Sequence, residues 1–174
     1  MLFLIESSQL MDSNLGMVMH SLNRYRPNVA AVILSEKYPD ICEFFIAQRC
    51  DIRDAWQFPQ GGIDSNETPI NALYRELKEE IGTSDIEVIS EYPKWVYYNF
   101  PRNVGVKLYP FKGQKQKYFL VKIKDEKNIH LDTKEPEFNQ YKFVKYDDVL
   151  SNTVFFKRLI YKRVLTYFKK EGYI

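Results

Sequence analysis

The chain has 174 residues, enough for one domain with a substantial hydrophobic core. Apolar residues make up 45% of it and charged residues 28%, a balance typical of a globular protein. The formal net charge is only +2, which excludes a global attraction for polyanions, so any affinity for nucleic acid must come from local clusters of basic residues.

No stretch approaches the ~20 consecutive apolar residues of a membrane-spanning helix. The apolar start, residues 1–5, lacks a basic leader, so we do not interpret it as a signal peptide. We expect residues 1–23 to be an extension outside the folded domain, residues 24–174; an additional packed helix is the alternative. Cys42 and Cys50 belong to no metal-binding or redox motif, which indicates free thiols in a reducing compartment and favours the cytoplasm.

The domain is predicted to open with two strands. Residues 29–34 form a continuous apolar run, and residues 43–48 form a second one after a Pro-Asp turn. We expect residues 54–60 to form a loop leading into Gly61 and Gly62. Glycines at this point let the backbone turn sharply and approach a bound group.

A helix of about three turns is predicted between Thr68 and Gly82. Thr68 can cap its N-terminus, Pro69 suits the first helical position, and Gly82 can end it in the left-handed conformation. Helical spacing places four apolar residues along one side, Ile70, Leu73, Leu77 and Ile81. That side is therefore expected to be buried.

Beside the apolar side, the helix presents three carboxylates within one narrow arc, those of Glu76, Glu79 and Glu80. Like charges three or four residues apart repel by ~0.2–0.5 kcal/mol per pair in an isolated helix, and Arg75 can offset only part of this. We therefore expect a cation at the remaining carboxylates, and hard divalent ions such as Mg²⁺ take oxygen ligands. A solvent-exposed acidic face is the alternative.

Four further strands are predicted over residues 86–90, 95–100, 118–123 and 141–146, with a loop or hairpin at 101–113. Residues 151–170 are predicted to form a helix. Its inward side chains would be Val154, Leu159, Val164, Leu165 and Phe168, and its outward ones Lys157, Arg158, Lys162, Arg163, Lys169 and Lys170. Several strands with one short helix and a longer final one indicate an α/β fold, a mixed β-sheet between helices.

The frame around the carboxylates resembles the signature of the Nudix hydrolases. In that signature a glycine, a spaced glutamate and an Arg-Glu-aliphatic run followed by two glutamates and a glycine stand in fixed register. The matching positions are Gly61, Glu67, Arg75, Glu76, Leu77, Glu79, Glu80 and Gly82. Thr83 stands where the family usually has an aliphatic residue, a departure that concerns packing behind the helix and not the ligands.

This resemblance implies an α/β/α sandwich that uses Mg²⁺ or Mn²⁺ to hydrolyse a phosphoanhydride in a nucleoside diphosphate linked to another group. We expect the metal ligands to be Glu76, Glu79 and Glu80, which share the arc, and by resemblance alone Glu137 from a late loop. Glu76 and Glu80 are both candidates for accepting the proton from water, and we assign Arg75 to the same catalytic group. Structural roles in the motif are expected for Gly61, Gly62, Glu67 and Gly82.

Four further segments resemble one branch of this family, the bacterial RNA pyrophosphohydrolases. They are residues 25–28 (YRPN), 56–62 (WQFPQGG), 113–117 (GQKQK) and 156–158 (FKR). Enzymes of this branch convert the 5′-triphosphate end of RNA to a monophosphate, which exposes the transcript to decay. The resemblance therefore implies an RNA 5′ end as substrate; a hydrolase of diadenosine polyphosphates is the main alternative.

Basic and aromatic residues in or near these segments are expected to bind the substrate, namely Arg26, Arg49, Lys115, Lys117, Phe156 and Lys157. The basic groups can meet phosphates, and Arg49 or Phe156 can stack on a terminal base. For each residue alone, a solvent-exposed or core position is the alternative. Two other functions compete: a nucleoside triphosphate-cleansing enzyme, and a non-catalytic nucleotide-binding module, against which three retained, mutually repelling carboxylates argue.

Overall fold

The computed structural model describes residues 24–100 and 109–174. The expectations for residues 1–23, and for most of the loop at 101–113, lie outside these described residues. The described residues fall into two compact units: 24–26, 97–100 and 109–115 in the smaller one, and 27–96 and 116–174 in the larger one.

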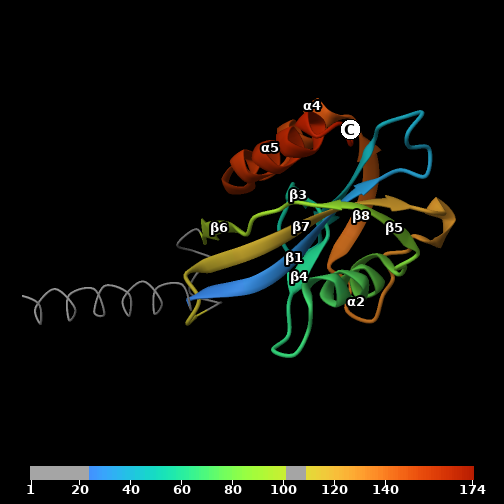
Figure 1. Ribbon diagram of the computed structural model, residues 1–174. Helices are drawn as coiled ribbons and strands as arrows, with labels where there is room; N and C mark the ends of the chain where they lie inside the picture. Colours follow the sequence, from blue (N-terminus) through green and yellow to red (C-terminus); the bar gives the residue numbers. More distant parts are fainter. Residues whose placement is uncertain (1–23, 101–108) are drawn as a thin grey trace, which may run out of the picture. The chain divides into compact units, whose positions relative to one another are not determined.

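The regular elements follow one another along the chain as Figure 1 shows. They are β1 (Tyr25–Leu34), β2 (Phe44–Arg49), β3 (Trp56–Gln57), β4 (Gln60–Gly62), α2 (Pro69–Ile81), β5 (Ile86–Glu91), β6 (Val96–Asn99), β7 (Gly113–Ile123), the 3₁₀ helix η1 (Glu126–Asn128), β8 (Phe138–Val144), α4 (Tyr146–Asn152) and α5 (Phe155–Lys170). In the part of the chain that the structure describes, no helix has the length and apolar character needed to cross a membrane.

Within the described residues the strands form one eight-stranded sheet in the order β3-β2-β1-β7-β5, and β4 pairs with β1, β6 with β7 and β8 with β2. Strand β1 is antiparallel to β2 and β4, whereas β1 and β7 run in the same direction (Figure 1). In the larger unit α2 covers one face of the sheet, and α4 and α5 cover the other (Figure 1). The prediction of an α/β fold with a mixed sheet between helices is confirmed.

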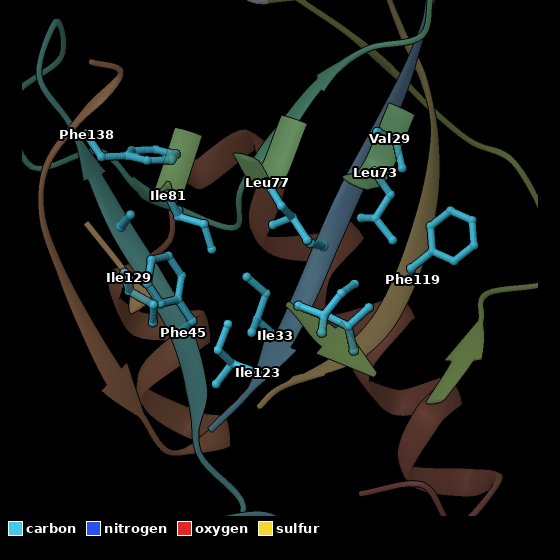
Figure 2. Close-up of a cluster of buried hydrophobic side chains, with 14 of the residues drawn as sticks. Val29, Ile33, Phe45, Leu73, Leu77, Ile81, Phe119, Ile123, Ile129 and Phe138 are labelled. Atoms are coloured by element: carbon cyan, nitrogen blue, oxygen red, sulfur yellow. The ribbon is translucent and has the colours of Figure 1, made fainter. Parts of the chain in front are cut away.

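The core beneath α2 is built from the apolar side of that helix and one face of the sheet (Figure 2). Leu73, Leu77 and Ile81 are at most 1% exposed and pack with strand residues such as Ile33 and Phe45. Burying side chains of this size stabilises a fold by about 1.5–3 kcal/mol each. This packing fixes the rotation of α2, and with it the direction of the neighbouring carboxylates.

Helix α2 has the ends that the sequence predicts. The Thr68 hydroxyl accepts a hydrogen bond from the Asn71 N–H, Pro69 is the first helical residue, and Gly82 is left-handed with φ 75°. A methyl group at Gly82 would also overlap the ring of His130, whose side chain is 54% exposed.

Replacing Gly82 with alanine is expected to lower the free energy of unfolding by about 1–2 kcal/mol, the cost of a left-handed backbone for an L-residue. Urea denaturation measures this loss. We expect Gly82→Ala to cost the same in a His130→Ala background, because the half-exposed ring can move aside and the backbone cannot. If Gly82→Ala did not lower the free energy of unfolding in the His130→Ala background, the overlap with the ring, and not the left-handed backbone, would be the cause of the loss.

The C-terminal region differs from its prediction in two respects. The single helix expected at residues 151–170 is two helices, because Thr153 and Val154 adopt non-helical backbone angles between α4 and α5. The expected register is also wrong at one turn: Lys157 is 4% exposed and Leu159 is 79% exposed. Downstream the prediction holds, since Val164, Leu165 and Phe168 are buried.

Several strand boundaries also differ from the predictions. Strand β7 begins at Gly113 instead of Tyr118, because polar residues in its first half are buried and hydrogen-bonded. Strand β8 spans Phe138–Val144, which leaves Tyr146 to begin α4. The expected loop at residues 54–60 contains the short strand β3, and Gly61 and Gly62 lie in β4.

Candidate active site

Arg75 on α2 gathers the carboxylates of the motif. Its guanidinium donates to Glu67 Oε2 at 2.7 Å, to Glu76 Oε1 at 2.7 Å and to Glu79 Oε2 at 3.1 Å. It also donates to the Gly62 carbonyl at 2.7 Å, which ties the helix to the end of β4. The hydrogen bonds from Arg75 lower the pKa of Glu67, so this glutamate is held as a charged partner of the arginine.

Glu80 is the most enclosed carboxylate of the group, with 2% exposure. Its Oε2 accepts the Gln60 N–H at 2.8 Å, whereas its Oε1 has no hydrogen-bond partner among the described residues. Burial raises the pKa of Glu80 well above the usual value, and the charges of Glu137 and Glu76 raise it further. An unpartnered buried oxygen beside two other carboxylates is a position that a cation would stabilise.

Glu76 lies between Arg75 and Gly61. Its side chain is 13% exposed, and burial raises its pKa even though Arg75 hydrogen-bonds to it. A methyl group added at Gly61 would overlap the Glu76 carboxylate. Glycine is therefore required here because β4 and the carboxylate approach each other closely.

Replacing Gly61 with alanine is expected to lower kcat about tenfold, because the added methyl group must displace a carboxylate of the site. Steady-state kinetics at saturating metal measure the loss. The matched control is Gly172→Ala, where a methyl group would meet no atom within 4 Å although the backbone is left-handed. Both variants lose some stability, but only Gly61→Ala should lose turnover; equal activities would contradict the role of the close approach.

Glu137 and Arg49 form the opposite side of the carboxylate group. Arg49 Nη1 donates to Glu137 Oε2 at 3.3 Å, and Arg49 Nε donates to Asp51 Oδ1 at 2.7 Å. The Glu137 carbonyl accepts the Cys50 N–H at 2.9 Å, which fixes the start of β8 against the end of β2. Because Glu137 raises the pKa of Glu80, the two carboxylates lie within electrostatic reach of each other.

A buried polar network underlies the carboxylates. Lys157 Nζ donates to Gln57 Oε1 and to Gln60 Oε1, both at 2.7 Å. Gln116 Nε2 donates to the same Gln60 oxygen at 2.9 Å, and the Tyr118 hydroxyl donates to Gln116 Oε1 at 2.7 Å. The network thus joins α5 and β7 to the residue whose backbone N–H holds Glu80.

Burial and, to a smaller extent, the charge of Arg49 lower the pKa of Lys157 to about 7, while Glu80 and Glu137 act in the opposite direction. The lysine is not on the solvent side of α5, as its sequence position suggested. It is a buried amine that donates to Gln57 and Gln60.

The remaining predicted substrate residues are Lys117, Phe156, Arg26 and Lys115. Lys117 forms an ion pair with Glu91 and donates to the Tyr92 carbonyl at 3.3 Å. Phe156, at the start of α5, is 39% exposed. Arg26 and Lys115 belong to the smaller unit, and their role in binding stays a prediction.

The residues that the sequence analysis did not single out are the glutamines and the tyrosine of the network. Gln57 and Gln116 are buried at 3% and 0% exposure, and Tyr118 is fully buried. Uncharged polar residues inside strands are seldom buried without a partner. The recurrence of glutamine at positions 57, 60, 114 and 116 was the available signal.

The carboxylates have the chemistry of a divalent-metal site. Among the described residues, no three Asp, Glu, His or Cys side chains are grouped as ligands of one ion, since Arg75 holds Glu76 and Glu79 as they stand. The unpartnered oxygen of Glu80, with Glu76 and Glu137 within electrostatic reach, nevertheless fits a hard cation with oxygen ligands.

Comparison with known proteins identifies the family of the chain. The model of the NUDIX domain matches residues 24–164. The chain is 65% identical over 150 residues to an RNA pyrophosphohydrolase of a Nitratiruptor species, covering 86% of this chain and 97% of that protein. It is 57% identical over 151 residues to an RNA pyrophosphohydrolase of Helicobacter pylori, covering 87% and 97%.

Solved structures share the fold at low sequence identity. The dihydroneopterin triphosphate pyrophosphohydrolase of E. coli superposes with a TM-score of 0.66 at 20% identity, covering 82% of this chain and 98% of that one. The Ap4A hydrolase of C. elegans, in a binary complex, gives a TM-score of 0.64 at 19% identity, covering 84% and 98%. At these low sequence identities, the two similarities show only that the fold is shared.

Proposed function

Since the chain belongs to the NUDIX family, we propose that it removes pyrophosphate from the 5′-triphosphate end of RNA and leaves a 5′-monophosphate, which exposes the transcript to decay. The chain is a hydrolase of phosphoanhydride bonds. The observation that carries the RNA substrate is the 65% identity, over 97% of its length, to a relative named RNA pyrophosphohydrolase. The complete set of motif carboxylates supports catalysis over a purely nucleotide-binding role.

The proposed cofactor is Mg²⁺ or Mn²⁺, held by Glu76, Glu79, Glu80 and Glu137. Such an ion neutralises charge on the phosphate oxygens and lowers the pKa of a bound water. To hold such an ion, Glu76 and Glu79 would have to give up their hydrogen bonds from Arg75, whereas Glu67 and the Gly62 carbonyl would keep the guanidinium in place. Arg75 is therefore proposed to position the ligands, and to limit their repulsion before the metal arrives.

The proton from the attacking water is proposed to pass to Glu76 or Glu80. Both have a raised pKa, which brings a carboxylate closer to the value that suits a general base near neutral pH. Glu80 Oε2 is fixed by the Gln60 N–H, so its orientation does not change when the proton arrives. A group that is already oriented needs no reorganisation during the reaction.

Positive charge for the substrate phosphates is proposed to come from Arg49 and Lys157 beside the carboxylates; Arg26, Lys115 and Lys117 are further candidates. Phe156 is 39% exposed at the start of α5, which leaves ring surface for stacking on a base. A polyanionic substrate favours the charged form of Lys157 and raises its pKa on binding. Substrate binding is thereby coupled to the protonation of Lys157, which belongs to the network beneath Glu80.

The remaining assignments concern where the protein works and how the chain is divided. We propose residues 24–174 as the hydrolase domain and residues 1–23 as an extension of it. An RNA substrate and two free, exposed cysteines, Cys42 and Cys50, support a cytoplasmic location.

The test compares kcat/KM for 5′-triphosphorylated RNA and for diadenosine polyphosphates with Mg²⁺ and with Mn²⁺. We expect a preference for RNA that declines with added salt, because phosphates beyond the first nucleotide contribute to binding. A preference for the dinucleotide, insensitive to salt, would assign the protein to small-molecule hydrolysis. The same assay with the metal removed by a chelator should show no turnover on either substrate.

A further inference from the structure

The outward side of α5 carries a concentration of positive charge that the catalytic site does not use. The helix, Phe155–Lys170, contains no acidic residue. Its exposed basic residues are Arg158, Lys162, Arg163, Lys169 and Lys170. We propose that this basic face of α5 binds the single-stranded RNA that follows the 5′ end, an inference that rests on the proposed function.

In the described part of the chain, ion pairs do not neutralise these charges. None of the five basic side chains forms an ion pair with another residue in the ranges 24–100 and 109–174; Arg158 donates to the Thr153 carbonyl at 3.3 Å, and Lys169 lies over the Tyr146 ring at 5.4 Å. The whole chain carries a net charge of only +2, so this face is a local excess. Arrays of unpaired cations attract the phosphates of nucleic acid by releasing their counterions.

Two large apolar side chains stand exposed at the start of the same face. Phe155 is 85% exposed and Leu159 is 79% exposed. An aromatic ring beside basic residues is typical of surfaces that bind single-stranded nucleic acid, where the ring stacks on a base and the cations follow the backbone.

The position of α5 connects this face to the site. Its first turn places Lys157 on Gln60, and its second stacks Tyr161 on Phe58, with the ring centroids 4.3 Å apart. From end to end the helix has 16 residues, about 24 Å. A shallow groove of about 440 Å³ follows it, lined by Leu159, Lys162, Arg163, Thr166, Tyr167 and Lys170.

An anionic membrane surface is the other polyanion that a basic helix can meet. Helices that lie in a membrane interface insert a continuous apolar side, and here that side is already occupied. Ile160, Val164, Leu165 and Phe168 are at most 9% exposed within the core of the larger unit. Because the exposed apolar residues are confined to the beginning of the helix, the charge pattern favours RNA.

The experiment uses the full chain and two substrates, a 5′-triphosphorylated dinucleotide and an unstructured 5′-triphosphorylated RNA of about fifteen nucleotides. The surface variant combines Lys162→Gln, Arg163→Gln and Lys170→Gln. Its charge-matched control removes three exposed lysines that lie in loops outside α5, by Lys37→Gln, Lys94→Gln and Lys134→Gln. Binding of the 5′-monophosphorylated long RNA is measured in parallel, because it does not depend on turnover.

We expect the kcat/KM of the surface variant on the long RNA to be roughly ten- to fiftyfold below that of the wild type near physiological salt. The steepness of log(kcat/KM) against log salt concentration should fall by about 2, because each of three lost phosphate contacts contributes ~0.7. The dinucleotide should be hydrolysed as by the wild type. The control variant should retain both activities. A Phe155→Ser variant should weaken binding of the long RNA roughly five- to 150-fold, which corresponds to about 1–3 kcal/mol of stacking.

Unchanged kinetics and binding on the long RNA would overturn the proposal while leaving the pyrophosphohydrolase activity in place. Failure of the wild type to hydrolyse either RNA would overturn the proposed function; loss of long-RNA binding in the surface variant alone would then still support this face as an RNA surface. If the surface variant lost the wild type's binding to phosphatidylglycerol vesicles but kept its RNA kinetics, the face would be assigned to a membrane and the proposal would be overturned.

Discussion

Replacing Glu80 with glutamine is expected to lower kcat about a thousandfold or more, while the metal-free protein becomes more stable. Glutamine keeps an oxygen to accept the Gln60 N–H, so the local structure should persist. It removes a negative charge that is 2% exposed and has an oxygen with no partner among the described residues. Relief of that burial is expected to stabilise the fold by about 1–3 kcal/mol.

The stability difference should depend on pH in a defined direction. The pKa of Glu80 in the folded protein is well above the usual value of 4.5, so the folded state binds a proton that the unfolded chain has released. As pH rises from 4.5 through the folded-state pKa, this group therefore makes the wild type less stable. The Glu80→Gln variant has no carboxyl to titrate at this position. Its Tm, measured with a chelator present, should therefore rise further above that of the wild type as pH increases from 4.5 through the folded-state pKa of Glu80.

Glu79→Gln is the matched control for the stability measurement. Glu79 is 59% exposed and pairs with Arg75, so its neutralisation should change the free energy of unfolding by less than about 1 kcal/mol at any pH. A destabilised Glu80→Gln protein, or one with nearly normal kcat, would contradict the picture of a charge held in an unfavourable position for the sake of metal binding and catalysis.

The site on α2 could be predicted from the sequence because its determinants are local. Thr68, Pro69 and Gly82 mark the ends of the helix, and the apolar period fixes the buried side, as Leu73 and Leu77 confirm. Once the helix and its rotation are known, the directions of the carboxylates follow from spacing alone. No long-range information was needed.

The network beneath the site could not be predicted in the same way, because its members meet only in the folded chain. Lys157 and Gln57 are 100 residues apart, and a lysine in an amphipathic helix is expected to face solvent. One local signal was present. The buried positions Ile160, Tyr161, Val164 and Leu165 repeat at helical spacing, and the same repeat extended backwards reaches Lys157 and not Leu159.

The buried position of Lys157 leads to the second large effect. Replacing it with methionine keeps the length of the side chain but removes the cation and both hydrogen bonds to Gln57 and Gln60. We expect kcat/KM to fall about a hundredfold even on the triphosphorylated dinucleotide, the value of a hydrogen-bonded buried charge of about 3 kcal/mol. Lys162→Met, on the outward side of the same helix, should leave that short substrate unaffected.

The stability of Lys157→Met should identify the lysine as the titrating group. The pKa of Lys157 is lowered from 10.5 to about 7 in the folded protein, so between these values the unfolded chain holds a proton that the folded protein lacks. The wild type therefore gains stability as pH rises from 7 towards 10.5, and the methionine variant, which has no group to titrate, should lack this gain. Parallel stability curves for the two proteins across that range would show that folding does not lower the pKa of Lys157, and would contradict its description as a desolvated, buried amine.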